Sequence, residues 1–238
     1  MLHILRNAVL LTAAVAICGL AVSVARADQV FVATGNIAAA GQVNAQATFH
    51  QSGANLLQIS LQNLQATSNV GQGISGIQFQ ICDAQGHVLN ITGSITTQNN
   101  ALILVDASGN VTSDGSGSHW GLSSAGPSFT MTALGFGVNP PDELILGPLS
   151  NPNGSIAGNG PHNPFINQQG VFTLTLSQTL PPGFQICNVV FLFGTVPSSL
   201  TPTAVPEPAS MLLLGSGLAG LGALARRRRA SRTLAQTK

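Results

Sequence analysis

Apolar and polar residues alternate over several short stretches in the middle of the chain, and this pattern limits the possible folds more than any other feature. It is clearest in LLQISLQNL at 56–64, IQFQIC at 77–82, FTMTAL at 129–134 and VFTLTLS at 171–177. Because successive side chains of a strand point to opposite faces, the pattern predicts strands with one buried face. The continuous apolar run from Val189 to Phe193 predicts a strand buried on both faces.

Turn-forming sequences such as GQG, DAQG, DASGN and SDGSGS separate the predicted strands. Further strands are expected at 29–34, 43–50, 87–98 and 100–105. About nine short strands without a capped amphipathic helix predict an all-β fold, either an antiparallel β-sandwich or a jelly roll. We expect this single domain to occupy residues 28–196.

Two proline-rich segments are not expected to form strands. Residues 139–165 contain six prolines and four glycines, which predicts a long surface loop. The sequence PSSLTPT at 197–203 predicts a short extended linker over residues 197–204, after the β-domain.

Positive charge is confined to the two ends of the chain. Charged residues make up 6% of the sequence, and every Lys and Arg lies before Ala27 or after Ala225. The acidic residues are Asp28, Asp83, Asp106, Asp114, Asp142, Glu143 and Glu207. Binding to nucleic acid depends largely on Lys and Arg side chains that neutralise phosphates, so no nucleic-acid partner is expected.

The first 27 residues have the features of a signal peptide. Arg6 precedes an apolar core, and the small residues Ala25 and Ala27 stand where a signal peptidase requires them. We expect export by the general secretion machinery and cleavage after Ala27. Cys18 leaves a lipoprotein anchor as an alternative, although Ile17 stands where that anchor needs a small residue.

An uncharged segment followed by arginines lies near the C-terminus. As a helix, residues 209–225 would extend about 26 Å, just enough for a thin bilayer core. The segment therefore predicts a single transmembrane helix. The four arginines after it predict a stop-transfer cluster on the cytoplasmic side of the inner membrane: Arg226, Arg227, Arg228 and Arg229.

A short motif, Val205, Pro206, Glu207 and Pro208, precedes this segment, and its prolines favour an exposed recognition peptide. Motif, apolar helix and arginine cluster together resemble the PEP-CTERM sorting domain of Gram-negative bacteria, here over residues 205–230. The resemblance implies an exosortase as partner, a membrane enzyme that processes the protein near the motif. It also implies inner-membrane anchoring during transit and a final place at the cell surface or in an extracellular matrix.

Cys82 and Cys187 remain after the predicted signal cleavage, and an oxidising compartment makes them a disulfide candidate. Strand parity opposes this pairing. It places Cys82 on the outward face of its strand and Cys187 on the core face, unless one strand bends or bulges. Two separate thiols therefore remain an alternative.

Motifs for catalysis or ligand binding are weak, and no cofactor or metal is expected. Asp106 and Asp114 bracket an oxygen-rich stretch that could hold Ca²⁺. Trp120, the single tryptophan, could stack on a sugar ring, but one Trp without any Tyr favours packing in the core or against a hairpin. Asp142 and Glu143 are paired acids that would point apart on a strand, which opposes acid/base chemistry.

These patterns predict a non-catalytic exported protein of the cell surface or extracellular matrix. Its Asn, Gln, Ser and Thr side chains would form hydrogen bonds with exopolysaccharide, as in a biofilm. A carbohydrate- or calcium-binding β-sandwich module is the alternative. A secreted hydrolase has the least support, since no nucleophile, base and orienting group can be assembled from the motifs.

Overall fold

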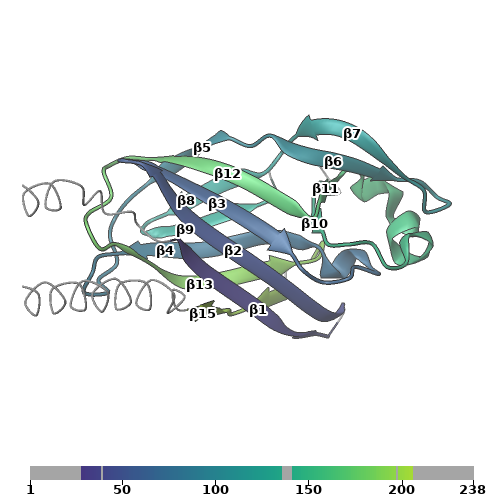
Figure 1. The fold of residues 1–238 in the computed structure, drawn as a ribbon, viewed down its shortest axis with the longest axis horizontal. Coiled ribbons are helices and arrows are strands. Elements are labelled where there is room, and N and C mark those ends of the chain that lie inside the picture. The colour runs from purple at the N-terminus through teal and green to yellow at the C-terminus, as the bar shows by residue number, and fades with distance from the viewer. Residues whose placement is uncertain (1–27, 39, 136–140, 197, 206–238) are drawn as a thin grey trace, which may run out of the picture.

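The computed structural model of the protein describes residues 28–38, 40–135, 141–196 and 198–205, which form two β-sheets and three short helical segments (Figure 1). The helical segments are η1 (Val70–Gln72), η2 (Pro152–Ile156) and η3 (Ala157–His162). Within the described residues the fold is therefore all-β, as the alternation predicts.

Six strands form the first sheet. Their spatial order is β15 (Thr203–Val205), β1 (Gln29–Ile37), β2 (Gly41–Gly53), β3 (Leu56–Asn63), β12 (Gln169–Leu176) and β5 (Gly93–Thr97).

The second sheet contains nine strands. Seven of them run in the order β14 (Ser198–Leu200), β13 (Gln185–Phe193), β4 (Ile74–Cys82), β10 (Ile145–Leu146), β11 (Phe165–Asn167), β6 (Asn100–Val105) and β7 (Val111–Gly117). The other two are β8 (Gly121–Ala125) and β9 (Ser128–Thr132), and β9 pairs with both β8 and β4. All pairs of named strands are antiparallel, apart from the parallel pair β10 and β11.

The two sheets pack face to face around a shared apolar core. Phe49 of β2 contacts Phe79 of β4 with 5.1 Å between ring centroids, and Phe79 stacks on Phe129 of β9 at 5.0 Å. Phe49 and Phe79 come from different sheets, so their contact joins the two layers. The inward residues of β3, Leu57, Ile59 and Leu61, are completely buried, as expected for a strand with one buried face.

The linker expected over residues 197–204 is instead part of the fold. β14 pairs with β13, where Leu200 lies opposite Phe191, and β15 pairs with β1, where Val205 lies opposite Val30. One short segment therefore adds an edge strand to each sheet (Figure 1). The outer edges of β1 and β13 offer backbone hydrogen-bonding groups to these two short strands, and composition alone does not reveal such partners. The β-domain therefore extends to Val205.

The surface loop expected over residues 139–165 is only partly found. Leu144, Ile145 and Leu146, in its first third, are completely buried, and β10 lies between β4 and β11. The prolines that made a strand improbable flank this short buried stretch and do not interrupt it. Residues 136–140 lie outside the described part of the chain.

Cys82 and Cys187 form a disulfide between β4 and β13, with 6.2 Å between their Cα atoms. The parity objection fails because β13 contains a bulge. Its register against β4 shifts between Cys187 and Val190, and Asn188 has a φ of 53°. The extra residue turns Cys187 to the same outward side as Cys82 while Val189 stays buried.

The disulfide gives a first prediction. Cys82→Ser combined with Cys187→Ser should lower the free energy of unfolding, because the bond closes a loop with a sequence separation of 105 residues. The chain-entropy description gives up to about 4.7 kcal/mol for a loop of this size. Urea unfolding of the two proteins, each with and without a reductant, measures the effect.

Reductant should weaken the parent protein to the level of the double variant and leave the variant unchanged. Free thiols at both positions in the unreduced exported protein, detected by alkylation and mass spectrometry, would contradict the bond.

Candidate functional site

The predicted sorting motif begins on an ordered edge of the first sheet. Val205, its first residue, is the last residue of β15 and is 46% exposed. The rest of the motif, the apolar segment and the arginine cluster lie outside the described residues, as do Ala25 and Ala27. Among the residues described, no helix is long and apolar enough to cross a membrane.

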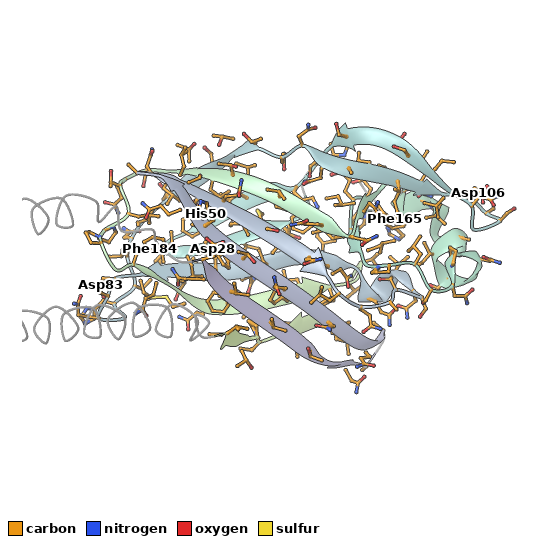
Figure 2. The ribbon with its side chains drawn as sticks, in the orientation of Figure 1. Asp28, His50, Asp83, Asp106, Phe165 and Phe184 are labelled. Atoms are coloured by element: carbon orange, nitrogen blue, oxygen red, sulfur yellow. A yellow bond between two sulfur atoms is a disulfide. The ribbon has the colours of Figure 1, made fainter. Side chains whose placement is uncertain are left out.

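The described chain enters and leaves the domain at the same place. Asp28 directly precedes β1, and the antiparallel register sets Val30 opposite Val205. Asp28 is held there by His50, whose Nδ1 lies 2.6 Å from the carboxylate Oδ1 (Figure 2). Any segment joined before residue 28 and any joined after residue 205 thus connect to neighbouring points of one sheet.

The structure brings His119 together with Asp142 and Glu143, a cluster that the sequence did not predict. His119 Nδ1 lies 3.3 Å from Glu143 Oε1 and 3.5 Å from Asp142 Oδ2. The backbone N–H of His119 also donates a hydrogen bond to Glu143 Oε2. Glu143 is 1% exposed, whereas the His119 side chain is 59% exposed.

The two acids converge because they are not on a strand. Glu143 adopts a left-handed backbone conformation with a φ of 56°, which brings both carboxylates towards His119. Its backbone N–H donates to Pro164 O at 2.7 Å, and the indole N–H of Trp120 donates to its carbonyl oxygen at 2.9 Å. The expectation that these acids point apart is therefore wrong.

The chemistry of this cluster follows from burial and charge. A buried carboxylate is costly unless it is paired or hydrogen-bonded, and the stretch from Ala27 to Ala225 has no Lys or Arg to pair with it. His119 supplies both a backbone donor and an imidazole. No group of three or more His, Cys, Asp and Glu side chains that could hold a metal ion is found in the described ranges. The observed contacts tie residues 142–143 to the segment between β7 and β8.

Trp120 and Asp106, the residues considered for sugar and calcium binding, both make contacts within the protein. Trp120 is 2% exposed and packs on Phe172 at 4.8 Å, so its ring lies in the core and not on a surface where a sugar could stack. Asp106 accepts hydrogen bonds from Ser108 N, Asn110 N and the Asn110 side chain, and these bonds lower the pKa of its carboxyl, Asn110 contributing most. That carboxylate stabilises its own turn, at the far end of the domain from Asp28 (Figure 2).

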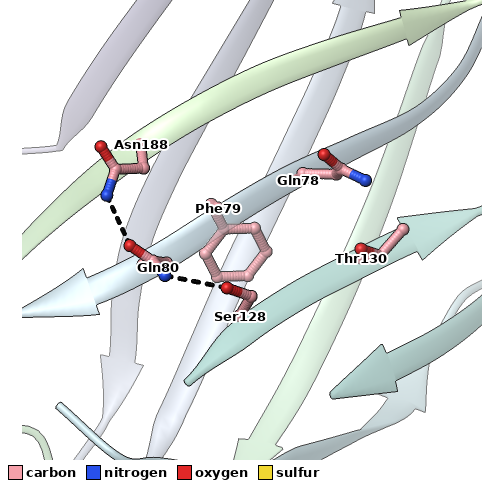
Figure 3. A pocket seen from close by; sticks show the side chains of 6 residues that line it. All are labelled: Gln78, Phe79, Gln80, Ser128, Thr130 and Asn188. Carbon is pink, nitrogen blue, oxygen red and sulfur yellow. Dashed lines mark hydrogen bonds between the residues drawn. The ribbon is translucent and has the colours of Figure 1, made fainter. Parts of the chain in front are cut away.

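A polar hollow lies on the outward face of β4, β9 and β13 (Figure 3). Its lining consists of Gln78, Phe79, Gln80, Ser128, Thr130 and Asn188. Sequence reasoning did not single out this site, although glutamines at alternate positions of IQFQIC place two amides on one face of β4.

The C-terminal segment matches a known protein family. The PEP-CTERM protein-sorting motif matches residues 204–229. The chain therefore carries a PEP-CTERM sorting motif, as its resemblance implied, and the matched region begins inside β15. No curated protein and no solved structure was found to match the chain.

The carboxylate cluster gives the second prediction. Glu143→Ala should lower the free energy of unfolding by about 2–4 kcal/mol, because it removes a buried acceptor and leaves the His119 N–H without its partner. Asp114→Asn is the matched control, since Asp114 is exposed on β7 and its replacement should change stability by less than about 0.5 kcal/mol. Urea unfolding of both variants measures the difference. Equal stability of the two would show that the cluster does not hold the segment.

Proposed function

We propose that this protein is a non-catalytic component of the cell surface or extracellular matrix, delivered there by an exosortase. The single observation that carries the proposal is the PEP-CTERM sorting motif at residues 204–229. Such a motif indicates an exported protein that passes through the membrane and is sorted by an exosortase. The final location and the role at that location are the proposed part.

The proposed route uses both ends of the chain. A signal peptide over residues 1–27 starts export, and an apolar helix over residues 209–225 stops it with Arg226–Arg229 in the cytoplasm. The β-domain then folds outside the inner membrane. β15 ends at Val205, so the recognition residues Pro206, Glu207 and Pro208 follow directly in sequence after the last described strand.

The β-domain has properties that suit an extracellular matrix. Its outward strand positions carry neutral polar side chains, for example Thr48, Ser60 and Thr173 on the first sheet. Amides and hydroxyls both donate and accept hydrogen bonds, so such a surface suits water and exopolysaccharide hydroxyls. The disulfide between Cys82 and Cys187 supports a place in an oxidising compartment.

The sorting function gives the third prediction. Glu207→Ala should leave the protein unprocessed and bound to the inner membrane, because it removes the charged side chain between the two motif prolines. Intact mass and cell fraction are compared for the parent and the variant, each in cells with and without the exosortase. The parent should lose the segment after the motif only when the exosortase is present.

Thr201→Ala is the control, since it changes an exposed residue shortly before the motif. It should be processed like the parent. If Glu207→Ala is also processed and localised like the parent, the motif is not the recognition element.

A further inference from the structure

The hollow on the second sheet has a volume of about 220 Å³ and a neutral lining. Apart from Phe79, whose ring is buried against Phe129, the lining side chains are amides and hydroxyls (Figure 3). None carries a charge.

The central amide of the hollow is fixed in place from two sides. Gln80 Nε2 donates a hydrogen bond to Ser128 Oγ at 2.8 Å, and Gln80 Oε1 accepts one from Asn188 Nδ2 (Figure 3). The three side chains come from β4, β9 and β13, so the row crosses three adjacent strands. This arrangement orders the groups before any ligand arrives, which reduces the entropy lost on binding.

The bulge in β13 places Asn188 at the rim of this row. Asn188 is the residue with a φ of 53°, and it lies between Cys187, opposite Gln80, and Val190, opposite Gln78. Bulges redirect side chains, and a non-glycine residue held in a left-handed conformation is a feature often found at binding sites. The disulfide at Cys187 fixes the backbone directly before the bulge.

Two further side chains in the hollow leave hydrogen-bonding groups available. Gln78 and Thr130 lie opposite each other on β4 and β9, and neither side chain has a hydrogen-bonding partner among the residues described. Ser123 of β8 lies opposite Thr130, on the other side from Gln78. A ligand bound over Gln78 and Thr130 would meet available donors and acceptors next to the ordered amide of Gln80.

We propose that this hollow binds a short stretch of neutral, hydroxyl-rich polysaccharide, an inference that rests on the proposed matrix function and names its contact site. Amides and hydroxyls match sugar hydroxyls because both groups donate and accept. A carboxylated, phosphorylated or sulfated polymer would find no Lys or Arg between Ala27 and Ala225 to pair with its charge. An extended peptide would instead be expected at a strand edge, whereas the hollow lies on the face of paired strands.

The site predicts weak binding to a single sugar unit, because the lining offers no exposed aromatic ring for stacking. Many such contacts along one polymer, made by several protein molecules, would still give firm association. The polymer and not the free sugar is therefore the appropriate probe.

The fourth prediction tests the hollow by affinity electrophoresis of the protein recovered from exporting cells. The gels contain dextran, galactomannan, the neutral fraction of the cells' own matrix, or carboxylated alginate. At least one neutral polymer should slow the parent protein more than alginate does. Gln78→Ala should lower the affinity derived from this retardation about three- to tenfold, the loss expected for one neutral hydrogen bond. Asn188→Gly should have the same effect, and glycine keeps the left-handed backbone at that position.

Gln58→Ala is the matched control, because Gln58 is a partly exposed amide on the outward face of β3 in the other sheet. It should leave the retardation unchanged, and thermal unfolding of all variants should match the parent. Absence of retardation in every neutral gel, stronger retardation by alginate, or equal retardation of parent and Gln78→Ala would overturn the proposal. Binding to immobilised denatured casein that Gln78→Ala weakens would assign the hollow to peptides instead.

The same variants separate this inference from the sorting function. Gln78→Ala should still be processed by the exosortase, as measured by its mature mass. Normal processing without polymer binding would remove only the hollow from the account, whereas polymer binding without exosortase-dependent processing would remove only the sorting route.

Discussion

The pairing of β4 with β13 is the interaction on which the other features of this domain depend. It carries the disulfide, the bulge at Asn188 and one wall of the polar hollow. It also connects the two sheets near the start of the domain, where Gln29 Oε1 of β1 accepts a hydrogen bond from Ile186 N at 2.7 Å. A covalent bond between cysteines 105 residues apart in sequence stabilises this arrangement, mainly by restricting the unfolded chain.

A second constraint is the near absence of charge. With all Lys and Arg at the ends of the chain, the buried acids of the β-domain are left with histidine and backbone donors. The same composition leaves the outward faces without Lys or Arg, so hydrogen bonding is the main interaction that they offer to a ligand. In the proposed route, targeting and surface chemistry are separated along the sequence: the basic ends direct the chain, and the middle, which has no Lys or Arg, provides the contact surface.

The sequence was a good guide to the longer strands and a poor one to short or irregular elements. Alternation predicted β3 and β12 because one face of each is buried along its whole length. It failed for β14 and β15, whose three residues each are too few for a pattern. Strand parity could not decide the disulfide, because the bulge lies at Asn188 and no glycine in the sequence indicates its position. The convergence of Asp142 and Glu143 was not predictable either, since it depends on a left-handed backbone conformation at a glutamate. The sorting motif, in contrast, is a local sequence and was recognisable without a structure.

The central claim is that an ordered, disulfide-linked β-domain is exported and separated from its targeting ends. Peptide mapping of the protein recovered outside the cells, by mass spectrometry without reduction, tests this most directly. The account predicts a chain that begins at Asp28, retains the strand residues up to Val205, lacks the arginine cluster, and yields one cross-linked peptide containing Cys82 and Cys187. An intact chain found only in the cytoplasm, with both cysteines reduced, would contradict it.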